Sequence, residues 1–159
     1  MQCLTRLEAQ VWLQEYLGKD IEELKPLRAW RIPSDAGRKM SLSKHIFSSL
    51  VWDDGGVLLI TGHGVWPSCE NMLLFDGFRR SLGEERSVDE APGHLIEINS
   101  AAEAEATFAL GLYYMWDMLL VNARDKLVIH VDHHEEMSLA ATHGEPLTKV
   151  FELLQNFFN

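Results

Sequence analysis

The stretch VIHVDHHEE, residues 128–136, gathers residue types that often do chemistry in proteins. Histidine exchanges a proton near neutral pH and binds metal ions, and carboxylates supply acids, bases and ligand oxygens. His130 and Asp132 stand two residues apart, so both side chains share one face if the segment is a β-strand. The stretch therefore raises two possibilities, a metal-dependent site and a charged turn that contacts another protein.

A metal site in this region would draw its ligands from His130, Asp132, His134 and His143. His-x-Asp is a common start of a 2-His-1-carboxylate iron site, because alternate strand residues can point at one ion. Such a site also needs a distant second histidine, and His143 is available for that role. Metal-dependent catalysis stays an alternative, while the leading interpretation below has no cofactor and no catalytic residue.

The hairpin interpretation divides the same stretch by strand alternation. Leu127, Ile129 and Val131 would face the core, and Val128, His130 and Asp132 would face the other way. Residues 133–136 would then form a tight polar turn before the next strand. On this interpretation only His130 and Asp132 could act together.

Hydrophobic periodicity and turn signals predict the elements that must position these residues. Thr5 and Glu8 have the spacing of a helix capping box, and Pro26 and Pro33 argue for an irregular segment over 19–40. Helices are expected over 5–17, 41–50, 69–82 (capped by Ser68), 100–113 and 146–158, and strands over 57–61, 116–121, 126–132 and 137–142.

These elements predict one α+β domain over residues 1–159. Its antiparallel sheet would contain the C-terminal three-stranded meander and the buried strand near 57–61, packed with helices. A chain of 159 residues that is 47% hydrophobic has enough apolar material for one core.

The charge balance favours some partners over others. The chain has 24 Asp and Glu against 14 Lys and Arg, a net charge of -10. A negative field repels nucleic acid and anionic lipid, and it attracts basic proteins. The chain has only two cysteines, Cys3 and Cys69, which argues against a disulfide framework. We see no signal peptide and no clean membrane span in the sequence, so we expect a cytoplasmic protein.

The segments YYMWDMLLV and KLVIHVDHHEEMSLAA, within about residues 100–142, resemble small acidic bacterial immunity proteins of polymorphic toxin systems. They are also similar to related uncharacterised bacterial families. The resemblance implies a cytosolic protein without catalysis that binds its partner through an acidic surface.

The leading hypothesis is therefore a non-catalytic binding or inhibitory protein that acts on a basic protein partner, such as a nuclease toxin domain. Its contacts would come from the acidic loops 84–90 and 132–136, namely Glu84, Glu85, Asp89, Glu90, Asp132, His133, His134, Glu135 and Glu136. One alternative is a metal-dependent enzyme using His130, Asp132 and His134. Another is a homo-oligomeric domain with an interface of exposed tryptophans such as Trp66, and the oligomeric state stays open.

Overall fold

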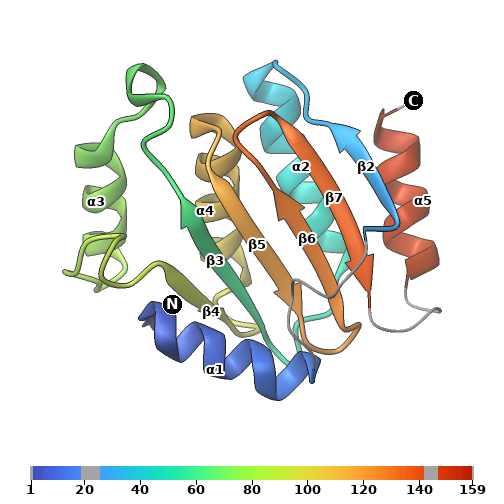
Figure 1. Cartoon of the computed structure of the whole chain (residues 1–159), viewed down its shortest axis with the longest axis horizontal. Coiled ribbons are helices and arrows are strands. Elements are labelled where there is room, and N and C mark those ends of the chain that lie inside the picture. The colour runs from blue at the N-terminus through green and yellow to red at the C-terminus, as the bar shows by residue number, and fades with distance from the viewer. Residues whose placement is uncertain (1, 19–25, 142–146, 159) are drawn as a thin grey trace.

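A computed structural model describes residues 2–18, 26–141 and 147–158, and these form an α+β fold around one seven-stranded antiparallel sheet (Figure 1). The fold class is therefore as predicted. The strands are β1 (Gln2–Leu4), β2 (Arg28–Arg31), β3 (Gly56–Gly62), β4 (Gly93–Ile96), β5 (Asp117–Asn122), β6 (Leu127–Val131) and β7 (Glu136–Ala141). They are arranged in the order β1-β4-β3-β5-β6-β7-β2.

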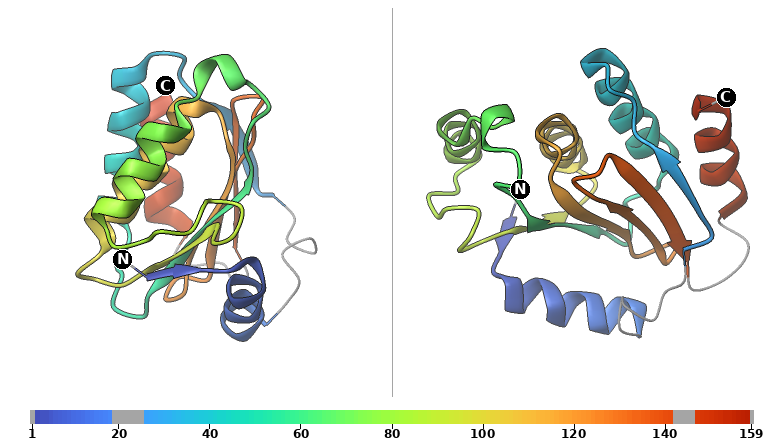
Figure 2. Two further views of the ribbon diagram at one scale, coloured as in Figure 1. Left: turned by 90° about the vertical axis from the view of Figure 1, so that its left-hand side faces the viewer. Right: turned by 45° about the horizontal axis from the view of Figure 1, so that its top comes forward.

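The helices cover the two faces of the sheet unequally. They are α1 (Arg6–Leu17), α2 (Ala36–Ser49), α3 (Met72–Ser81), α4 (Ala101–Tyr114) and α5 (Leu147–Phe158), with a short 3-10 turn, η2 (Pro67–Cys69), before α3. Figure 2 shows α2, α3, α4 and α5 on one face and α1 alone across the other. In the part of the chain that the structure describes, no helix is long and apolar enough to cross a bilayer.

Strand alternation produces two separate apolar cores. Leu58, Leu120 and Ile129 belong to the large core beneath the four helices. Their neighbours in sequence point to the opposite face, where Val57, Val121 and Val128 pack against α1 in a smaller core.

Hydrogen bonds at the helix starts explain where the predictions succeeded and failed. The capping box before α1 is present, since the Glu8 backbone N–H donates to Thr5 Oγ1 and the Glu8 carboxylate accepts from the Thr5 backbone N–H. The second helix begins at Ala36, five residues earlier than predicted, because Asp35 caps it by accepting from Arg38 N at 2.9 Å. The third is capped by Asn71 and begins at Met72, while Ser68 lies in η2.

Three short strands were not predicted from the sequence. β1, β2 and β4 have only three or four residues each, too few for a clear alternating pattern. β4 pairs with β1 and β3, and β2 pairs with β7. Gly93 lets α1 approach this edge, because a Cβ there would lie 3.0 Å from the side chains of Ala9 and Leu4.

Candidate functional site

The C-terminal meander places the stretch VIHVDHHEE as the alternation predicted. Ile129 and Val131 are buried in the large core, and Val128 is buried against α1. His130 lies on the same face as Val128 but is exposed. The turn after β6 brings Asp132 to Glu135 to one end of the sheet, the upper end in Figure 1.

Asp132 binds the backbone of its own turn. Its Oδ1 accepts hydrogen bonds from His134 N at 2.9 Å and from Glu136 N at 3.0 Å. Glu135 then takes a left-handed backbone conformation, with φ of 61°, and donates its N–H to the Asp132 carbonyl. The carboxylate of Asp132 therefore organises the turn, as Asp commonly does in such positions.

Glu135 turns inward to a buried lysine. Its Oε1 lies 3.1 Å from Lys39 Nζ, and Lys39 on α2 is only 5% exposed. Burial of an ammonium group requires a close counter-charge, so this carboxylate neutralises Lys39 within the chain.

His133 is fixed by Asp117, the first residue of β5. Asp117 Oδ1 accepts from the His133 backbone N at 2.7 Å and lies 2.8 Å from its Nδ1. This contact fixes the orientation of the imidazole ring at the end of the sheet. The sequence pattern had placed Asp117 in the strand of the segment YYMWDMLLV but had given it no role at the site.

Glu84 in the loop 84–90 is engaged by Arg86. Arg86 Nε donates to Oε1 at 2.8 Å and Nη2 to Oε2 at 2.6 Å, a bidentate pair. These bonds, together with the nearby charge of Arg79, lower the pKa of Glu84 to about 2. Arg86 also donates to the Cys3 carbonyl at 3.0 Å, so the pair holds this loop against β1.

The rest of the loop keeps more of its charge at the surface. Glu90 accepts from the Ser87 backbone N and Oγ, both at 2.9 Å, and these bonds lower the pKa of Glu90. Asp89 Oδ1 lies 2.9 Å from His63 Nε2, and the Asp89 side chain is 80% exposed. Glu85 is exposed and has no hydrogen-bond partner among the residues that the structure describes.

The connector after β3 joins the two predicted loops. His63 reaches Asp89, while Trp66 Nε1 donates to the His133 carbonyl at 3.2 Å. Glu70 Oε1 anchors the same connector, since it accepts from Gly64 N at 2.6 Å and from the buried Trp116 Nε1 at 2.7 Å. We call the surface formed by Val65, Trp66, Asp89, His133 and His134 the Trp66 edge.

The described residues of the metal alternative do not converge on one site. His130 is exposed on the face of the sheet that carries α1, Asp132 Oδ1 binds its turn, and His134 is exposed next to the His133 ring. His143 lies outside the described residues. Among those that are described, no three His, Cys, Asp or Glu side chains lie close enough together to hold a metal ion.

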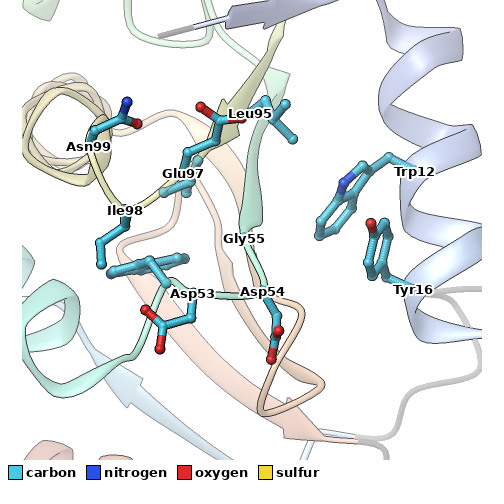
Figure 3. Close-up of a pocket in the computed structure, with 11 residues that line it drawn as sticks. Trp12, Tyr16, Asp53, Asp54, Gly55, Leu95, Glu97, Ile98 and Asn99 are labelled. Atoms are coloured by element: carbon cyan, nitrogen blue, oxygen red, sulfur yellow. The ribbon is translucent and has the colours of Figure 1, made fainter.

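A groove of about 450 Å³ lies at the other end of β3, between α1, the turn at 53–55 and residues 95–99. Figure 3 shows Trp12 and Tyr16 extending from α1 on one side of Gly55, with Glu97 and Ile98 on the other. The Trp12 and Tyr16 rings stack with centroids 4.3 Å apart. We call this feature the α1 groove, and sequence reasoning had missed it because its walls come from three distant segments.

Comparison with protein-family models, with curated proteins and with solved structures gave no match to this chain. The Trp66 edge and the α1 groove are the two surfaces whose geometry bears on its function.

Proposed function

We propose that this protein is a non-catalytic binding protein that captures a basic protein partner, as an immunity-type inhibitor would, and that the Trp66 edge is its contact surface. The observation that carries the proposal is that Trp66 is both exposed and held in one orientation. Its side chain is 45% exposed, and its indole N–H is tied to the His133 carbonyl.

An exposed tryptophan held in one orientation suits a binding anchor. Tryptophan is enriched among the residues that dominate interface energies, and a fixed ring loses little conformational entropy on binding. Val65, also 45% exposed, extends the apolar area beside it. Trp30, Trp52 and Trp116 are buried, so they stabilise the core and offer no surface to a partner.

The charge around the anchor fits a basic partner. Glu84 is neutralised by Arg86, and Glu135 is neutralised by Lys39. The negative charge that the two loops present to a partner therefore comes from their exposed carboxylates, which are Glu85, Asp89, Glu90 and Glu136. Together with the net charge of -10, these carboxylates would speed association with a cationic protein. The proposal places this encounter in the cytoplasm.

A photo-cross-linking experiment tests the proposal. A photoreactive amino acid is introduced at position 66 and, as a control, at Met40 on α2, which is 56% exposed. Cross-linking in the source cells is expected to trap one basic protein from position 66 and not from position 40. Trp66→Ala should then weaken binding of the purified partner about tenfold or more, and Met40→Ala less than about twofold.

Three results would count against the proposal. A cross-link from position 66 to a second copy of this chain would favour the homo-oligomeric alternative. A second copy is acidic and so is not the basic partner that the proposal requires. An acidic partner, or a basic one that binds Trp66→Ala as tightly as the wild type, would also reject it. Elemental analysis of untagged protein separates the metal-dependent alternative, which requires close to one bound ion per chain.

A further inference from the structure

The α1 groove combines an aromatic wall with carboxylates. Trp12 and Tyr16 form the wall, and Tyr16 is 39% exposed. Asp53, Asp54 and Glu97 are exposed residues of the lining. Aromatic faces attract cations, and carboxylates pair with them, so both parts of the lining favour the same kind of ligand.

The carboxylates differ in how much of their bonding capacity is already used. Asp53 Oδ2 lies 3.1 Å from Arg124 Nη1, so a guanidinium of the same chain already binds at this rim. The side chains of Asp54 and Glu97 have no hydrogen-bond partner among the residues that the structure describes. The groove thus holds two carboxylates without a partner among the described residues in the same lining as the aromatic pair.

We infer that the α1 groove binds an arginine side chain presented by a basic polypeptide. A planar guanidinium can stack on an aromatic ring and donate in-plane hydrogen bonds to a carboxylate, which an ammonium does less well. A volume of about 450 Å³ holds more than one side chain, so the occupant would be a short segment with arginine at its centre.

The groove is a second contact, separate from the Trp66 edge. β3 starts beside the groove at Gly56 and ends at Gly62 next to His63, which puts the two surfaces roughly 20 Å apart along the strand. The inference shares with the proposed function only the class of partner, a basic polypeptide. Its test uses short peptides, so either idea can fail while the other stands.

The test is an NMR titration of the ¹⁵N-labelled protein with an acetylated, amidated pentapeptide of one arginine flanked by glycines. The Trp12 indole N–H and the backbone amides of Gly55 and Asn99 are expected to shift in a saturable way. A twin peptide with citrulline, which has the same shape without the charge, should bind at least about fivefold more weakly, and a lysine peptide about twofold more weakly.

Variants of the groove sharpen the result. Asp54→Asn and Glu97→Gln should each weaken binding about twofold to threefold, and Arg124→Ala should strengthen it about twofold by removing the competing guanidinium. Glu152→Gln, an equal charge change at an exposed residue of α5 outside both surfaces, serves as the control and should leave affinity unchanged. These exposed variants keep the test decisive even if Trp12→Ala, which also packs against the smaller core, fails to fold.

Several outcomes would overturn the inference. They are the absence of shifts at the groove, equal shifts with the citrulline peptide, and unchanged binding by the Asp54→Asn/Glu97→Gln double variant. Shifts confined to the Trp66 indole would also overturn it, while they would support a cation-binding role for the Trp66 edge.

Discussion

In the predicted acidic loops, Glu84, Asp132 and Glu135 bind groups of their own chain, whereas Asp54 and Glu97 at the α1 groove have no hydrogen-bond partner among the described residues. The loops have the denser run of acidic letters in the sequence, yet much of that charge holds the fold together. Acidic density in a sequence is therefore a poor guide to which carboxylates can meet a partner.

The largest loss of stability is expected from Trp116→Ala, a change beneath the connector that joins the two acidic loops. Trp116 is fully buried, packs edge-on against Phe75 and donates to Glu70, which holds the connector of the Trp66 edge. Its loss should lower the free energy of unfolding by about 3–5 kcal/mol, measured by urea denaturation.

Trp66→Ala is the matched control for Trp116→Ala, because Trp66 is 45% exposed and makes one indole hydrogen bond. Its removal should cost about 1 kcal/mol or less. Equal losses in the two variants would mean that Trp66 is part of the core and not a binding anchor.

An intermediate effect, dependent on pH, is expected from Glu84→Gln. Removing a carboxylate paired with Arg86 and close to the buried Arg79 should cost about 1–3 kcal/mol at pH 7. The pKa of Glu84 is about 2 in the folded protein and near 4.5 when unperturbed, so the unfolded chain binds more protons between these values. The stability from Glu84 is thus fully present above about pH 5 and is lost as the pH falls toward 2.

Urea denaturation at a series of pH values between 7 and 3 checks this prediction. The difference between wild type and Glu84→Gln should stay constant from pH 7 to about pH 5 and then shrink as the pH falls to 3. A difference that stays constant over this range would show that the carboxylate charge does not contribute, and that Glu84 acts only through packing.

The smallest effect on stability is expected from the groove carboxylates. Asp54→Asn and Glu97→Gln should change the free energy of unfolding by less than about 0.5 kcal/mol, because neither side chain has a structural partner among the described residues. Thermal unfolding of both variants beside wild type is sufficient. A loss above about 1 kcal/mol in either would remove the contrast between loops and groove.

Local signals were enough to predict much of the fold. The capping box of Thr5 and Glu8 and the glycine at position 18, with φ of 64°, define α1 without help from distant residues. The alternation in 127–131 assigned Ile129 and Val128 to opposite faces correctly. The strands at 28–31 and 93–96 were missed because such short segments become strands only through pairing with neighbours.

The candidate surfaces were less predictable for the same reason. Trp66 stood out in the sequence as a loop tryptophan, but its bond to His133 joins residues 67 positions apart. Glu135 and Lys39 are 96 positions apart, and nothing in either segment indicates that they pair. The α1 groove required α1, the turn at 53–55 and β4 to meet, which no local pattern encodes.

The sequence by itself determined the start of α1, the strand faces and the net negative charge, because capping, alternation and composition are properties of neighbouring residues. The tertiary structure alone decided which of those negative charges remain available to a partner. An ion pair or a groove forms between segments that the sheet order brings together, and that order depends on the packing of the whole chain.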